Sequence, residues 1–285
     1  MTRKRLTQIL PWLTPLRQWQ RKSCFYAGMR LDGHRYSREK RESIPFQTLL
    51  YQAKSRLYNA ETGFPMVFQE NKVWNLKLAA KALDGLVIGP GETYSFWRSI
   101  RHADREEPYR DGLALVDGKL TTSHGGGLCQ MSNMLFLLFL HSPLTIVERH
   151  PHQVKEFPDP EEDGLKGVDA TVAEGWLDVK VKNEGYNTFR LSVSVGEEYL
   201  VGRLLYDGED DTYYRISNDN LTYYREERRI YEEVDVIRHM ERRGRRDKVA
   251  SQKLYHNRCE IRYPLQPNVK IVEKSEKPNG GKRDG

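Results

Sequence analysis

A cysteine that follows three consecutive glycines is the feature of this sequence best suited to chemistry. The glycines are Gly125, Gly126 and Gly127. They let the backbone approach a ligand closely or adopt positive φ angles. The apolar run over residues 128–140 predicts a buried helix, so that Cys129 would lie in its first turn. Free N–H groups and a partial positive charge at that turn stabilise a thiolate, and they therefore predict a nucleophilic cysteine.

The same turn predicts an oxyanion hole. The backbone amides of Leu128, Cys129 and Gln130, with the Gln130 side chain, would surround the oxygen of a carbonyl that the thiolate attacks. Cys129 could instead be a small apolar residue packed under the helix. The glycine loop and the helix start could also bind a carboxylate without any chemistry.

A base must accompany the thiol, and three histidines are candidates: His124, His150 and His152. His150 and His152 lie on either side of Pro151 at the end of a predicted strand, so in extended geometry both would point to the same side. One of them would deprotonate Cys129, while the other would orient it or protonate the leaving group. A surface loop is the alternative interpretation of this His-Pro-His segment.

Two more side chains complete the predicted site. Asp169 begins the next predicted strand and would orient a histidine as the third member of a triad. If side chains alternate strictly between the two faces of the strand, Arg149 points away from the histidines. The pattern leaves open whether Arg149 binds a substrate carboxylate or only packs against the protein. Cys129 with His150 and His152 also fits a Cys-His-His zinc site, but no CxxC spacing supports one. We therefore predict neither a metal nor another cofactor.

The elements that must position these residues predict an α+β fold, with the buried helix after the glycine-rich loop packed on a mostly antiparallel sheet. Helices are expected over 48–58 and 72–83 from the spacing of apolar residues. Strands are expected over 92–97, 145–148, 168–181 and 189–206, and a hairpin over 113–122 that turns at Asp117 and Gly118.

Composition along the chain divides it into three parts. Residues 45–206 form the predicted compact domain, and residues 1–44 form a basic, amphipathic N-terminal arm. Residues 207–285 are a charged extension rich in tyrosine. Within this extension, 225–248 is expected to be a solvated helix or an extended arm, and 274–285 a disordered tail.

The basic charge of the chain is concentrated in the arm. The formal net charge is +6, and seven Lys and Arg residues precede the first acidic residue, Asp32. A basic arm on a nearly neutral body favours contact with an anionic membrane surface over nucleic-acid binding, for which no recognition module is visible. The arm could instead pack as a helix on its own domain.

No apolar run approaches the roughly 18–20 residues of a membrane span, and the arm lacks the apolar core of a signal peptide. The three cysteines exclude a disulfide-stapled scaffold. We therefore expect a cytoplasmic protein, at most peripheral at the inner face of the membrane.

Four segments together resemble the VanW family. They are Pro90-Gly-Glu-Thr-Tyr-Ser-Phe-Trp97, Gly125-Gly-Gly-Leu-Cys-Gln130, Glu148-Arg-His-Pro-His152 and Asp169-Ala-Thr-Val172. The resemblance implies an association with vancomycin (glycopeptide) resistance and with peptidoglycan precursors or stem peptides as partners. It also implies acyl transfer of the L,D-transpeptidase type, in which a cysteine attacks a peptide-stem carbonyl and an amine resolves the acyl-enzyme. Cys129 would then be the nucleophile and His150 or His152 the base. An accessory protein that binds a precursor carboxylate at the glycine-rich loop is the alternative.

Overall fold

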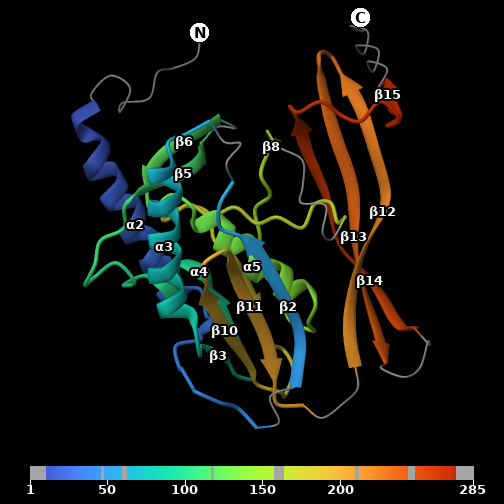
Figure 1. The fold of residues 1–285 in the computed structure, drawn as a ribbon. Helices are drawn as coiled ribbons and strands as arrows, with labels where there is room; N and C mark the ends of the chain where they lie inside the picture. Colours follow the sequence, from blue (N-terminus) through green and yellow to red (C-terminus); the bar gives the residue numbers. More distant parts are fainter. Residues whose placement is uncertain are drawn as a thin grey trace, which may run out of the picture.

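A computed structural model describes residues 11–45, 48–59, 63–116, 119–156, 164–208, 212–242 and 248–273. The fold is α+β, as the sequence predicts (Figure 1). The helices in these ranges are η1 (Pro11–Leu13), α2 (Thr14–Leu31), α3 (Met66–Leu83), α4 (Phe96–Ile100) and α5 (Leu128–Leu140). None of them is long and apolar enough to cross a membrane.

The strands of the described residues form three larger sheets and one hairpin, and most neighbouring strands are antiparallel. The first sheet has the order β1 (Arg35–Tyr36), β4 (Glu92–Ser95), β9 (Lys180–Lys182), β7 (Thr145–Glu148). The second has the order β2 (Thr48–Arg56), β11 (Tyr199–Tyr206), β10 (Phe189–Val195), β3 (Val87–Ile88). The third has the order β15 (Ile271–Glu273), β12 (Thr212–Glu226), β13 (Arg229–Arg242), β14 (Lys248–Ile261), β8 (Val154–Lys155). The hairpin joins β5 (Asp111–Val116) to β6 (Lys119–His124).

The central element is α5, which packs against β2 and β11 and contacts α3. Its interior carries no β-branched residue, and side chains such as Leu135, Phe136 and Phe139 are almost completely buried. Burying each such side chain contributes roughly 1.5–3 kcal/mol to the hydrophobic stabilisation. Figure 1 shows α5 with the helices α3 and α4 on one side and, on the other, the sheet that contains β2 and the sheet that contains β13. The N-terminal end of α5 is thereby held in place by the core of the protein.

Several predicted elements are confirmed by the structure. The helices over 72–83 and 128–140 lie in α3 and α5, and the strand over 145–148 is β7. The hairpin over 113–122 is β5 and β6, although its turn lies outside the described residues. The predicted strands over 189–206 are the β10–β11 hairpin.

Three predictions about elements are wrong. Residues 48–56 form the strand β2, which pairs along its length with β11, rather than a helix. Between 168 and 181 only the end of the segment is a strand, β9, and the preceding part is held by an isolated bridge and by loop hydrogen bonds. The strand expected over 92–97 ends at Ser95, because the Ser95 hydroxyl accepts a hydrogen bond from the Arg98 amide and begins α4.

The charged extension also differs from the expectation of a solvated helix or an extended arm over 225–248. It forms the long antiparallel strands β12, β13 and β14, on the right of Figure 1. Ile216 and Val236 of this sheet belong to the same hydrophobic cluster as α5. Lys155 of β8 and Glu232 of β13 form a buried ion pair with an N–O distance of 3.0 Å. The sheet is therefore packed directly against the part of the chain that carries the histidines. The tail over 274–285 and the first ten residues lie outside the described residues.

Candidate functional site

The loop before α5 is built so that only glycine fits. Gly125 and Gly127 have φ angles of +71° and +99°, which L side chains rarely adopt. Gly126 has no room for a side chain, because a Cβ there would lie 2.1 Å from the carbonyl oxygen of Gly112 in β5. The Asn75 side chain of α3 donates to the Gly126 carbonyl at 2.9 Å and accepts from the Arg110 amide at 2.8 Å. The loop is thus fixed between α3 and the β5–β6 hairpin.

Replacing Gly126 by alanine is expected to destabilise the protein by about 1–3 kcal/mol, because the atom in the way is backbone and cannot rotate aside. Gly28→Ala is the matched control, since a Cβ at that helical position meets nothing within 4 Å. The control should be neutral or stabilise the protein by about 0.5–1 kcal/mol. The free energy of unfolding in urea measures both changes, and a Gly126→Ala protein as stable as the native one would contradict the prediction.

The structure brings Cys129, His152 and Asp169 together. Cys129 is half-buried in the first turn of α5, and its thiol lies 3.6 Å from the Thr171 hydroxyl and 3.8 Å from the Val172 carbonyl oxygen. Asp169 Oδ2 contacts His152 twice, at 2.7 Å from Nδ1 and 2.7 Å from the backbone amide. Nδ1 of His152 is thus engaged by Asp169, which leaves Nε2 as the ring nitrogen that can interact with the Cys129 thiol. A nucleophile, its base and an orienting carboxylate would need this order, so the three side chains form a candidate triad.

The electrostatics of the three groups favour an ion pair. Burial alone raises the pKa of the Cys129 thiol, but the hydrogen bond and charge of His152 outweigh it and lower the pKa below its ordinary value. Burial lowers the pKa of His152, but hydrogen bonds to Asp169 and Cys129 raise it to about 9. Asp169 is held ionised, because its bond with His152 and the charge of Arg149 outweigh its burial and lower its pKa. At neutral pH His152 is therefore an imidazolium, and its charge favours the thiolate form of Cys129 over the neutral thiol.

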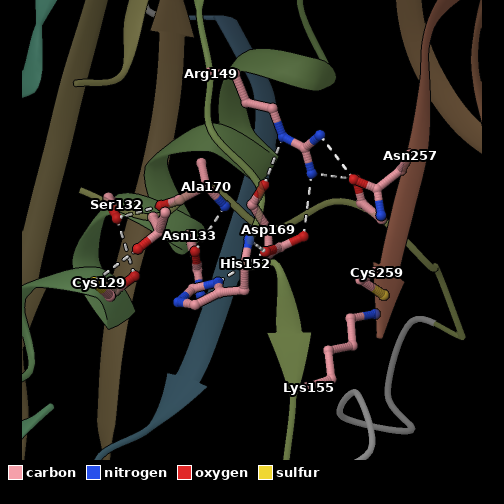
Figure 2. Close-up of polar contacts among 12 residues, drawn as sticks. Cys129, Ser132, Asn133, Arg149, His152, Lys155, Asp169, Ala170, Asn257 and Cys259 are labelled. Carbon is pink, nitrogen blue, oxygen red and sulfur yellow. Dashed lines mark hydrogen bonds and ion pairs between the residues drawn. The ribbon is translucent and has the colours of Figure 1, made fainter. Parts of the chain in front are cut away.

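Arg149 fixes the carboxylate rather than pointing into the cavity. Its side chain is only 7% exposed, and its guanidinium lies 3.1 Å from Asp169 Oδ1. The same group donates to the carbonyls of Asp169 and Gly167 and, at 2.9 Å, to Oδ1 of Asn257 in β14. Figure 2 shows this chain of contacts running from Asn257 through Arg149 and Asp169 to His152. The C-terminal sheet thus takes part in holding the third member of the triad.

The structure places two other predicted residues elsewhere. His150 Nε2 lies 3.0 Å from Glu148, which also contacts Lys180, so His150 joins an ion cluster on the first sheet. The Gln130 side chain donates to Ser55 and to the Arg56 carbonyl in β2. Both side chains are therefore committed to contacts away from the thiol.

An oxyanion beside the thiol would consequently be bound by backbone amides. The Gln130 amide donates to the Gly127 carbonyl at 3.0 Å. Within the described residues, no acceptor is found for the amides of Leu128 and Cys129. These two N–H groups, at the positive end of α5, can stabilise a negative oxygen next to the thiol.

A cavity of about 860 Å³ opens over the thiol. Residues of both charges line it, including Lys72, Asp104 and Glu174, and the predicted base His124 also lies on its wall. The Lys72 side chain passes directly over Gly127, where a Cβ would lie 2.1 Å from its Cγ, and burial lowers the pKa of its amine to about 8. Among the described residues, no group of three or more His, Cys, Asp or Glu side chains could hold a metal ion. The cavity is large enough for a peptide-sized ligand with a carboxylate.

Comparison with known proteins shows to which family the chain is related. A family model described as VanW like protein matches residues 71–205. The vancomycin B-type resistance protein VanW of Enterococcus faecalis is 52% identical over 274 residues, which cover 96% of this chain and 99% of that protein. The chain belongs to the VanW family. The uncharacterized protein YoaR of Bacillus subtilis is 36% identical over 115 residues, or 40% of this chain and 35% of that protein. No solved structure matches.

The segment matched by the VanW family model contains the glycine loop and all three members of the triad, but not Asn257. Sequence reasoning missed Asn257 and Lys72. A single asparagine in a charged strand gives no signal of its role. Lys72 could have been found, because it begins the predicted helix over 72–83 and precedes its apolar face.

Proposed function

We propose that this protein is a cysteine-dependent acyltransferase that acts on peptidoglycan stem peptides or their precursors and contributes to glycopeptide resistance. The observation that carries the proposal is the arrangement of Cys129, His152 and Asp169 at the start of α5 under a cavity. The resistance role is supported by the name of the Enterococcus faecalis relative and by the extent of the match to it.

The chemistry follows from the positions of the side chains. The Cys129 thiolate attacks a peptide carbonyl, and the amides of Leu128 and Cys129 stabilise the oxyanion. The carbon–nitrogen bond breaks as the His152 imidazolium donates its proton to the leaving amine, and a thioester remains on Cys129. An acceptor amine, losing a proton to His152, then attacks the thioester and frees the thiolate. The reaction is an amide exchange, so no oxidant or reductant is needed.

A second candidate function is binding of a substrate carboxylate without chemistry. It is favoured by Lys72, which carries a positive charge into the same cavity next to Gly127. The amides at the start of α5 would add hydrogen bonds to the same carboxylate.

The test measures two properties of Cys129 in the native protein. We expect the rate of its alkylation by iodoacetamide, followed by peptide mapping, to have a pH midpoint below the ordinary thiol value of about 8.5. Cys24, which is exposed, is the comparison thiol in the same sample, and Cys259 is buried. We also expect a covalent adduct on Cys129 in the intact mass after incubation with a purified stem peptide and no acceptor amine. A midpoint at or above the ordinary value together with no adduct would leave only the binding function.

A further inference from the structure

The N-terminal half of α2 projects from the body of the protein with large apolar side chains exposed. Every residue from 14 to 24 is exposed. Trp12, Leu16 and Trp19 have 73%, 61% and 67% of their surface in water. Figure 1 shows this end of α2 at the edge of the molecule, away from the sheets. Two exposed tryptophans only seven residues apart are uncommon on a surface that contacts only water.

The three apolar residues fall on one side of the segment. Leu16 and Trp19 are three residues apart in α2, and Trp12 lies four residues before Leu16 in η1. Residues three and four apart are neighbours on a helical surface. The opposite end of α2 is anchored by Tyr26 and Met29, which are buried on the domain. The free end therefore presents an apolar stripe on a firmly attached helix.

Positive charge surrounds this stripe. α2 contains Arg17, Arg21, Lys22 and Arg30 and no acidic residue, and the first acid of the chain is Asp32. Tryptophan and leucine on a basic helix are the residues that enter the headgroup region of anionic bilayers. A second copy of the chain fits poorly, because symmetric pairing of α2 would bring like charges together.

We propose that the N-terminal half of α2 docks the protein onto an anionic phospholipid bilayer, with Trp12, Leu16 and Trp19 entering the headgroup region. The basic charge of α2 attracts the anionic headgroups.

The docking helix is joined to the rim of the cavity. Tyr26 donates to Glu174 at 2.9 Å, Lys22 forms an ion pair with the same carboxylate, and Arg21 lies over the Trp176 ring at 5.4 Å. Lys22, Glu174 and Trp176 all line the cavity above Cys129. A docked protein would therefore hold the cavity rim beside the bilayer, where an amphiphilic substrate resides. This consequence rests on the proposed function, whereas the docking itself does not.

Sedimentation with vesicles tests the docking without any enzymatic assay. We expect the full chain to bind vesicles of phosphatidylcholine mixed with phosphatidylglycerol, with a blue shift of tryptophan emission, and to be released by high salt. Vesicles of pure phosphatidylcholine should bind it at least about tenfold more weakly. Trp12→Ala/Trp19→Ala should lose about tenfold or more in affinity for the anionic vesicles. Because both residues are exposed, the variant should unfold at the same urea midpoint as the native protein.

Tyr186→Ala is the matched control, since Tyr186 is 97% exposed on a turn outside α2. The control should bind like the native protein. The proposal is overturned by absence of binding, by equal binding to both kinds of vesicle, or by unchanged binding of the double variant. It is also overturned if the native chain is a dimer in solution that the double variant dissociates.

Discussion

The substitution Cys129→Ser is expected to abolish the covalent adduct and to reduce acyl transfer by at least about a thousandfold. Serine is close to isosteric with cysteine and would retain the contacts with Thr171 and Val172. Its hydroxyl, however, is far less acidic than a thiol, so almost none of the nucleophilic anion is present at neutral pH. The mass of the protein after incubation with a stem peptide, and the rate of amide exchange, measure the two effects.

Cys24→Ser is the control for the loss of a thiol, because Cys24 is exposed on α2 and outside the cavity. It should leave both the adduct and the rate unchanged. Binding of the stem peptide to Cys129→Ser should also survive, since Lys72 and the first amides of α5 are untouched. Undiminished turnover by Cys129→Ser would refute the nucleophilic role of the thiol.

The part of the site that the sequence could predict is local. Three glycines before an apolar run indicate both the loop and α5. Residues other than glycine rarely adopt φ angles of +71° and +99°, and a long apolar run without β-branched residues favours a helix. The sequence placed His152 and Asp169 by the thiol from predicted strand ends, whereas in the structure both residues lie in loops between strands. The choice between His150 and His152 could not be made, because it depends on Glu148, whose carboxylate binds His150 at 3.0 Å.

The error at β2 has a physical origin in a β-bulge. Leu50, Ala53 and Leu57 are buried, and their spacing of three and four residues is that of a helix. In the structure Tyr51 pairs with Leu204 and Leu49 with Leu205, so Leu50 is the extra residue of the bulge. A bulge shifts the alternation of buried and exposed residues along a strand by one position. In β2 this shift produces the three- and four-residue spacing of a helix.

The C-terminal sheet was missed because charge occupies its buried face. In β13 the side chains of Glu232, Val234 and Val236 are fully buried at alternate positions. The alternation of buried residues that is typical of a strand is therefore present. The first of these buried residues, however, is Glu232, whose charge is compensated by Lys155 at 3.0 Å. The sequence does not show that Lys155 pairs with Glu232, so the segment resembles a solvated surface. The role of Asn257, which lies in the same sheet, could therefore not be predicted either.

The second large effect is expected from Asp169→Asn, which should move the alkylation midpoint of Cys129 upward by about one pH unit or more. Without the carboxylate, the pKa of His152 falls from about 9 toward its ordinary value, because the strongest group that raised it is gone. Less imidazolium is then present at neutral pH, so the thiolate loses its partner and the pKa of Cys129 rises. At a pH below both midpoints, a thiol whose pKa is higher by about 1 is alkylated about tenfold more slowly, because its thiolate fraction is about tenfold smaller.

The same substitution leaves the buried Arg149 without its carboxylate, which costs about 3–5 kcal/mol of stability, so a structural cause must be separated from an electrostatic one. Asn257→Ala makes this separation. It removes the 2.9 Å bond to Arg149 but keeps both contacts between Asp169 and His152. Urea unfolding should show a loss of stability in both variants, whereas the upward movement of the midpoint should be confined to Asp169→Asn. Equal changes of the midpoint in the two variants would mean that Asp169 only supports the fold. A higher midpoint in Asp169→Asn alone would mean that its charge, through His152, is what makes Cys129 a thiolate.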